Sequence, residues 1–363
     1  MADEHADNNR RRLRRANRIA WALAIMVFPL IWMGGLVTTY NAGMAVPDWP
    51  NTYGYNLFLY PIESWLKTWD VFLEHSHRLI GATVGFLAIA LVVALWRHGD
   101  RRYRWWALGV LAAVSAQGVL GGIRVIGREM LLADIHGCTA PLVFAACAWM
   151  VMATSARWSD RSVWESSEPS AARARLAGWP FWLLAVTTYC QIVLGAQVRH
   201  LFPTLPVLWG TLWVWLHVGV GLSLVLLWGI VRRVVGVVRG ECPFLVRRVN
   251  WFLGLYIVQL LLGAGTWVTN YNWPRWFTNN FVAVPFTVRD GGMLQATTTT
   301  AHVAVGSLLL IAAFSAAVWA SRRRVFVEPE VATSAKAGKA RATAVAEKTG
   351  AGRSADHKKH RRR

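Results

Sequence analysis

Four times along the chain, a histidine in an apolar stretch is followed by small residues: HRLIG from His77, HGCTA from His136, HVGVG from His217 and HVAVG from His302. Each stretch follows another apolar segment with a related end: LIWMGGLVT from Leu30, QGVLGGIRV from Gln117, QIVLGAQVR from Gln191 and QLLLGAGTW from Gln259. A pattern that recurs along a chain is the signature of a repeated structural unit. The sequence therefore predicts a pair of helices that is repeated four times.

Eight apolar stretches are each long enough to cross about 30 Å of hydrocarbon as a helix. Of all residues, 55% are hydrophobic and only 16% are charged, whereas a soluble domain has about 25% charged residues. The sequence predicts an all-α membrane protein whose eight transmembrane helices form two parallel, pseudo-symmetric four-helix bundles, related by an axis along the membrane normal. The predicted helices cover residues 19–40, 72–96, 104–125, 133–156, 178–199, 208–231, 249–270 and 296–320.

The predicted division of the chain follows these helices. We expect a basic cytoplasmic N-terminus at 1–18, an N-terminal four-helix half at 19–156, a cytoplasmic linker at 157–177, a C-terminal four-helix half at 178–320 and a basic, disordered cytoplasmic tail at 321–363.

The formal net charge of +20 is concentrated in arginine clusters beside the apolar segments. Alternate loops are nearly free of Lys and Arg, which is the positive-inside pattern and predicts that both termini are cytoplasmic. We therefore expect this positive charge to interact with the lipid bilayer, and we expect no nucleic acid partner. We expect no cleavable signal, and Asp3, Glu4 and Asp7 argue against a mitochondrial transit peptide. A bacterial inner membrane is the expected location.

The four repeated histidines are the strongest candidates for a site, because histidine is costly to place in hydrocarbon. One such imidazole alone has an alternative role, since it can hydrogen-bond to a neighbouring helix. Four at equivalent positions favour metal ligation, because duplicated packing positions drift toward apolar residues. Two neutral imidazoles that face each other across a four-helix half suit the axial positions of haem iron. The predicted iron ligands are His77, His136, His217 and His302.

Small residues accompany the histidines in every repeat. Four positions after each histidine, on the same helix face, we expect a flat wall for a porphyrin, built by Gly81, Ala140, Gly221 and Gly306. The glycines that end the preceding segments are expected to pack helices together: Gly34, Gly35, Gly121, Gly122, Gly195 and Gly263.

The depth of the histidines is also informative. From each histidine to the next cytoplasmic arginine, the chain runs about 22–32 Å at the rise of an α-helix. All four histidines are therefore expected toward the outer leaflet, with His217 somewhat deeper. This side-by-side arrangement disfavours a chain of haems that carries electrons across the membrane.

The N-terminal half contains an acid that the C-terminal half lacks, in EHSHR from Glu74. Glu74 and His77 are three residues apart and share a helix face. A carboxylate beside an iron site can accept a proton or offset developing positive charge. The alternative is an ordinary acid at a helix N-terminus. His75 is expected to point away from that face, toward water.

Three arginines are predicted at the outer ends of helices: Arg78, Arg124 and Arg199. A planar guanidinium suits the carboxylates of haem propionates. The competing interpretation is that these side chains extend to the membrane interface. The sequence leaves both roles open.

The E-x-x-H-R motif from Glu74, the loop AGMAVPDWP from Ala42 and single histidines on the fourth, sixth and eighth helices resemble the haem A synthase family. The resemblance covers roughly residues 18–324. Members of that family convert haem O to haem A by oxidising the C8 methyl group to a formyl group. The resemblance implies the following roles: His77, His136 and Arg78 hold the substrate haem O, Glu74 serves the oxidation, and His217 and His302 hold a haem b cofactor.

One departure from the family concerns cysteine. Some members carry a cysteine pair in the first outer loop, and Val46 stands where one of them would be. A thiol relay is therefore not expected here. The chain's four cysteines also predict no disulfide framework: Cys138, Cys147, Cys190 and Cys242.

Two other functions stay open at this point. A di-haem b membrane electron-transfer protein would contain two haem b groups and neither haem O nor haem A. A haem transporter would hold haem transiently and would need no acid beside His77. The partners left open are a haem O synthase, an electron acceptor and a second copy of this chain in a homo-oligomer.

Overall fold

The computed structural model describes residues 2–127, 130–159, 178–199, 206–236, 243–280 and 291–321. Most of the predicted linker at 157–177 and all but the first residue of the predicted tail at 321–363 lie outside the described residues, as does Cys242.

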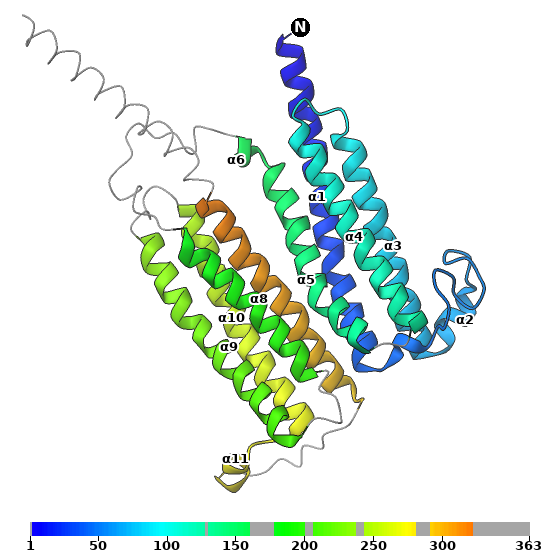
Figure 1. Ribbon diagram of the computed structural model, residues 1–363, viewed down its shortest axis with the longest axis vertical. Helices are drawn as coiled ribbons and strands as arrows, with labels where there is room; N and C mark the ends of the chain where they lie inside the picture. The colour runs from blue at the N-terminus through cyan, green and yellow to red at the C-terminus, as the bar shows by residue number, and fades with distance from the viewer. Residues whose placement is uncertain are drawn as a thin grey trace, which may run out of the picture.

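Eight helices of the described chain are long and apolar enough to cross a membrane, which confirms the predicted class and number of spans. Seven are labelled in Figure 1, and the eighth, which we call the C-terminal helix, is Met293–Ser321. The labelled ones are α1 (Ala2–Thr39), α3 (Trp69–Leu95), α4 (Arg101–Gly127), α5 (Met130–Ala153), α8 (Trp179–Arg199), α9 (Val207–Gly236) and α10 (Pro243–Tyr271). Short helices lie between them: η1 (Ala42–Met44), α2 (Ile62–Lys67), α6 (Ala156–Ser159) and α11 (Arg275–Asn280).

The first helix is longer than predicted. It begins at Ala2 and includes the basic segment that was expected to precede the span. Within that segment, Arg11 pairs with Asp7 one turn earlier at 2.8 Å. Further along, the amide of Asn17 donates to Val151 O at 2.9 Å and so ties α1 to α5. The basic residues therefore continue the membrane helix.

The eight spans form two groups that lie side by side (Figure 1). The N-terminal half contains α1, α3, α4 and α5, with the short α6 at its end, and the C-terminal half contains α8, α9, α10 and the C-terminal helix. Large apolar side chains cover the outside, for example Val93, Leu226 and Leu261, which are 69–70% exposed. Such a surface is suited to contact with lipid chains.

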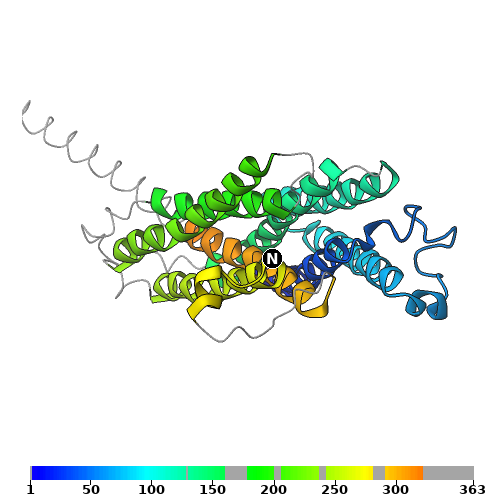
Figure 2. The same ribbon diagram turned by 90° about the horizontal axis from the view of Figure 1, so that it is seen from below.

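The two ends of the molecule differ. The N-terminus, the connection at 96–100 and α6 lie at one end, which we call the arginine-rich end, whereas η1, α2 and α11 lie at the other, which we call the loop end (Figure 1). Seen from below in Figure 2, the C-terminal helix lies between the other helices of its half and the N-terminal half. Its buried side is built from small residues such as Ala304, Ala313 and Ala317, which allow helices to approach closely.

Polar contacts join the two halves toward the loop end. Nη2 of Arg199, at the end of α8, donates to Gly35 O at 2.9 Å and to Thr39 Oγ1 at 2.6 Å on α1. Nε2 of Gln197 donates to Oδ2 of Asp134 on α5 at 2.5 Å. Hydrogen bonds between membrane helices satisfy groups that lipid cannot. These contacts fix α8 against two helices of the other half.

Two further contacts join the halves. A Cβ added to Gly35 would lie 2.9 Å from Cγ2 of Thr300, so α1 and the C-terminal helix are in close contact there. Near the arginine-rich end, the rings of Trp158 and Trp319 meet edge to face with centroids 5.4 Å apart. The halves are thus in contact toward both ends.

Candidate functional site

Each half holds one pair of histidine rings. In the N-terminal half, His77 on α3 faces His136 on α5, with ring centroids 6.5 Å apart and ring planes at 81°. In the C-terminal half, His217 on α9 faces His302 on the C-terminal helix at 6.2 Å and 76°. The structure brings together the two histidines of each half, whereas their ligation of iron stays a prediction.

The separation of the rings suits two ligands on opposite sides of one metal ion. An imidazole nitrogen binds a first-row metal at about 2 Å and the ring centroid lies roughly 1 Å further, so opposed ligands have centroids about 6 Å apart. In addition, the Nδ1 atoms of His77, His217 and His302 are buried without a hydrogen-bond partner. Buried polar atoms without partners are costly, and the donor set therefore fits a metal group between the rings.

A glycine of the preceding helix faces each of the four rings. A Cβ on any of these glycines would lie 2.9–3.1 Å from the Cε1 atom of the ring, inside the 3.4 Å at which ordinary contact begins. The pairs are Gly34 with His77, Gly121 with His136, Gly195 with His217 and Gly263 with His302. These glycines pack helices, as predicted, and they also provide the space that each ring occupies.

A glutamine contacts three of the four histidines at the main chain. Its Nε2 atom donates to the histidine carbonyl oxygen at 2.7–2.9 Å: Gln117 to His136, Gln191 to His217 and Gln259 to His302. In two of them the Nε2 atom also lies near a ring nitrogen: Gln117 is 3.1 Å from Nδ1 of His136, and Gln191 is 3.3 Å from Nε2 of His217. In the repeat that contains His77, Leu30 stands where the other repeats have glutamine. A Cβ added to Gly81 would lie 3.8 Å from Cδ1 of Leu30. These glutamines have no role among the predictions from sequence, although each stands four residues before the glycine that faces the ring.

The small residues one turn after the histidines have a different neighbour from the predicted porphyrin. A Cβ on Gly221 would lie 2.9 Å from Nε2 of Gln191, and one on Gly306 would lie 3.2 Å from Nε2 of Gln259. The space beside these two glycines is therefore filled by glutamine amides.

Glu74 and Arg78 form a buried ion pair beside the N-terminal histidine pair. Nη2 of Arg78 lies 2.6 Å from Oε1 of Glu74, and the two side chains are only 8% and 4% exposed. The second carboxylate oxygen accepts the backbone N–H of Val46 at 2.8 Å. Both carboxylate oxygens of Glu74 are thus engaged, one by α3 itself and one by the loop that follows α1, which the sequence predicts as the first outer loop.

Arg78 extends this contact along the loop. Its Nη1 donates to Asp48 O and Asn51 O, each at 2.7 Å, and its Nη2 donates to Val46 O at 2.9 Å. Both terminal nitrogens are therefore used by the loop and by Glu74. The predicted role of Arg78 in holding the substrate stays a prediction, and the geometry favours an indirect role through the position of the loop.

The first outer loop, residues 40–68, is an ordered cap over this half. Trp49 packs directly on Gly122 of α4, and Gly43 packs directly on the guanidinium of Arg124. Near its tip, the carboxylate of Asp48 accepts the backbone N–H groups of Tyr53 and Gly54, each at 2.8 Å. Burial raises the pKa of Asp48, but these amide hydrogen bonds outweigh it and hold the pKa below its usual value.

His75 does not face water, and that expectation is wrong. The side chain is 2% exposed, and its Nδ1 atom lies 3.1 Å from Oγ1 of Thr52. Its ring also contacts the rings of Tyr60 and Trp65, with centroids 5.1 and 5.3 Å away. The first outer loop folds over this face of α3, which a helix considered alone would leave exposed.

The remaining two arginines differ in their surroundings. Arg124 lies in the electrostatic environment of Glu74, His77 and His136, beneath the loop at Gly43. Arg199 donates instead to α1, as described above, and joins the halves. Neither side chain simply extends to the membrane interface. Of the two, Arg124 is the better placed to meet an anionic group beside the N-terminal pair.

Comparisons with known proteins agree with these observations. A family model described as cytochrome oxidase assembly protein, COX15-CtaA, matches residues 17–211, which is more than half of the chain and includes His77 and His136. The match ends before His217 and His302.

Several curated relatives share the name Heme A synthase. The protein from Allorhizobium ampelinum is 27% identical over 222 residues, 52% of this chain and 58% of the relative. The one from Rhizobium etli is 25% identical over 238 residues, 55% and 60% of the two chains. The one from Symbiobacterium thermophilum is 28% identical over 269 residues, 66% and 81% of the two chains. The chain thus spans less than two thirds of the length of the first two.

Proposed function

Because this chain belongs to the COX15-CtaA family of cytochrome oxidase assembly proteins, we propose that it is a membrane oxidoreductase that converts haem O into haem A. The relatives described above carry the corresponding name. One observation carries the proposal. Two histidine pairs have nearly the same geometry, and within the described residues the pair at His77 alone has a buried acid–arginine pair and an ordered loop beside it.

The asymmetry supports different roles for the two pairs. His77 and His136 hold haem O as the substrate, since the acid lies on their side. His217 and His302 hold a haem b cofactor. Haem b held by two imidazoles supplies one-electron transfer. The ring separations, the unpartnered Nδ1 atoms and the glycines that face the rings support both assignments.

The reaction is two successive hydroxylations of the C8 methyl group, after which the resulting gem-diol loses water and leaves the formyl group. With water as the oxygen source, four electrons and four protons leave the substrate overall. The macrocycle spreads the charge that develops at the methyl carbon, which lowers the cost of removing its hydrogens. The protein must then hold the substrate in one orientation, accept protons close to it and pass the electrons to an external acceptor.

Glu74 is the group proposed to serve the oxidation. In the structure its carboxylate is engaged by Arg78 and by Val46 N, so it is held in place rather than mobile. A fixed, buried carboxylate can offset positive charge that develops on the substrate, and its charge is felt strongly where water is excluded. Arg78 is a positioning residue, because it fixes both Glu74 and the loop.

The location follows from the same proposal. We place the chain in a bacterial inner membrane with the arginine-rich end on the cytoplasmic side, because arginines gather there and positive residues are retained inside. Both histidine pairs then lie toward the outer leaflet. A haem O synthase that delivers the substrate, an electron acceptor and self-association are the partners that this function would involve.

The test is haem analysis of a host that makes haem O and carries this gene. We expect haem A from the unmodified protein, and bound haem O without haem A from Glu74→Gln. The matched control is Glu63→Gln, because Glu63 is an exposed carboxylate of α2 in the same loop. If Glu74→Gln makes as much haem A as the unmodified protein, Glu74 does not serve the oxidation. If it loses bound haem O as well, Glu74 acts by holding the loop.

A second candidate function is a di-haem b electron-transfer protein. The near identity of the two pairs favours it, because their ring separations differ by little and their angles are alike. Pigment extraction from the purified protein separates the two functions. Two haem b per chain, with neither haem O nor haem A, would establish the electron-transfer protein instead of the enzyme.

A further inference from the structure

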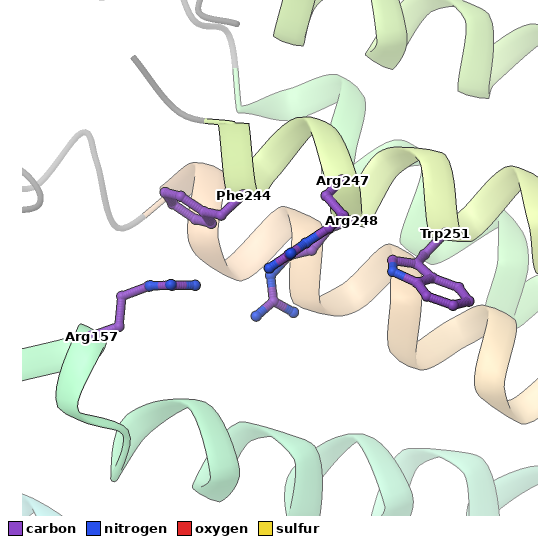
Figure 3. Close-up of a pocket in the computed structure, with 5 residues that line it drawn as sticks. All are labelled: Arg157, Phe244, Arg247, Arg248 and Trp251. Atoms are coloured by element: carbon purple, nitrogen blue, oxygen red, sulfur yellow. The ribbon is translucent and has the colours of Figure 1, made fainter. Parts of the chain in front are cut away.

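A cavity of about 240 Å³ lies at the arginine-rich end, remote from both histidine pairs. Its lining comes from both halves: Arg157 of α6 on one side, and Phe244, Arg247, Arg248 and Trp251 of α10 on the other (Figure 3). Three guanidinium groups therefore converge on one space between the halves. Like charges that face one space repel each other, and an anion bound between them removes this repulsion.

Aromatic rings hold two of these arginines in place. The guanidinium of Arg157 lies over the ring of Phe244, 5.2 Å from its centroid, and that of Arg248 lies over the ring of Trp319 at 5.7 Å. Nη1 of Arg248 also donates to Oγ of Ser315 at 3.3 Å. Such contacts reduce the freedom that a guanidinium would lose on binding an anion.

Arg247 and Arg248 take part in no ion pair among the residues that the structure describes; the pairs found there involve Arg11, Arg78 and Arg102. Arg247 is exposed, and Figure 3 shows its side chain beside that of Arg248 at the edge of the cavity. The site therefore presents positive charge that the described protein does not neutralise at these two residues.

A second cavity, also of about 240 Å³, shares Arg157 and Arg248 with the first. It is lined further by Trp21, Val151, Met152, Ser155 and Trp319, which are mostly apolar. The two cavities therefore adjoin at Arg157 and Arg248, and the second is an apolar groove lined by residues of α1, α5 and the C-terminal helix. An apolar groove offers no favourable contact to a free inorganic anion, whereas it can bury part of the acyl chains of a lipid.

We propose that this site binds an anionic phospholipid, with its phosphate between Arg157, Arg247 and Arg248 and its acyl chains in the groove between the halves. The site lies where the α10 span begins, which is the level of lipid headgroups, and tryptophan side chains favour that level. Basic pockets between membrane helices at the cytoplasmic side suit anionic headgroups. A lipid bound there contacts both halves and stabilises their association.

The experiment measures thermal unfolding of the full-length purified protein in mild detergent while lipid is added. The probes are phosphatidylglycerol, phosphatidylcholine and inorganic phosphate at equal phosphate concentration. A ligand that binds only the folded protein raises the midpoint temperature. We expect phosphatidylglycerol to raise it and the other two probes to leave it unchanged within error.

The variant that tests the site is Arg247→Gln, since Arg247 is exposed and its loss should not prevent folding. Each arginine near a headgroup contributes enough to change the half-saturating lipid concentration about fivefold. Arg247→Gln and Arg248→Gln should each show this weakening. Arg233→Gln is the matched control, because Arg233 is an exposed arginine of α9 at the same end and lines neither cavity; it should titrate like the unmodified protein.

Three results would overturn the proposal. Equal stabilisation by inorganic phosphate would identify a free-anion site. Equal stabilisation by phosphatidylcholine would show that the arginines do not select charge. An unchanged titration of Arg247→Gln would place lipid binding elsewhere, even if Arg248→Gln fails to fold. None of these results depends on the haem chemistry proposed above.

Discussion

Replacing Gly263 by alanine perturbs the C-terminal histidine pair directly. The added Cβ would lie 3.1 Å from Cε1 of His302, so the ring must withdraw by about 0.3 Å to reach the 3.4 Å of an ordinary contact. Metal–ligand distances tolerate only about 0.2 Å. Overpacking of this kind costs about 1–3 kcal/mol, which corresponds to a loss of about 5- to 150-fold in haem affinity if the whole cost falls on binding.

The assay is the haem b content per chain, measured as the pyridine haemochrome after purification. We expect Gly263→Ala to retain substoichiometric haem b or to lose its six-coordinate absorption spectrum. The matched control is Gly254→Ala, nine residues earlier on α10, where an added Cβ meets nothing within 4 Å. Alanine stabilises a helix by about 0.5–1 kcal/mol relative to glycine, so this control should fold at least as well and keep its haem.

The N-terminal half offers the same comparison for the substrate. Gly121→Ala places a Cβ 3.0 Å from Cε1 of His136, whereas Gly118→Ala on the same helix meets nothing within 4 Å. Gly121→Ala should lower bound haem O and haem A and leave haem b unchanged. A full complement of haem b with an unaltered spectrum in Gly263→Ala would show that the ring does not need the space beside the glycine.

Three further outcomes are expected. Arg199→Met removes two hydrogen bonds between the halves and should lower the unfolding free energy by about 1–3 kcal/mol, measured by thermal denaturation. Gln259→Leu copies the position of Leu30 and should lower the midpoint temperature by a few degrees, with His302 still bound to haem in the absorption spectrum. Asp48→Asn should expose the first outer loop to proteolysis at pH 7. In the unmodified protein the pKa of Asp48 lies below its ordinary value of 3.8, so the charged carboxylate stabilises the loop above pH 3.8. That stabilisation is lost only as the pH falls through the lower pKa of the folded protein.

The spans and the histidine pairs follow from local pattern, which is why the sequence predicts them well. Hydrophobic length determines where a chain crosses a membrane, and the repeat places His77, His136, His217 and His302 at equivalent positions of four similar helices. A repeat also fixes which side of each helix faces the next one. The pairing of rings is therefore a consequence of the pattern, even though the residues of a pair are far apart in sequence.

The surroundings of Glu74 could not be obtained in this way. Its partner Val46 and the burial of His75 both depend on how a loop of nearly thirty residues folds back on α3, and no periodicity encodes that path. The glutamines are a different case. Gln117, Gln191 and Gln259 recur at one position of the repeat, so the signal was present, but a polar residue in an apolar stretch has many potential partners.

The contacts between the halves constrain how this molecule can move. Alternating access requires one bundle to rock as a rigid body against the other around a central substrate. Such a hinge would have to pull Gln197 from Asp134 toward one end, or Trp158 from Trp319 toward the opposite end. Because the two halves are joined toward both ends, neither half can tilt against the other without breaking a contact. The molecule is better suited to keeping two redox groups at a constant separation than to carrying a cargo across the bilayer.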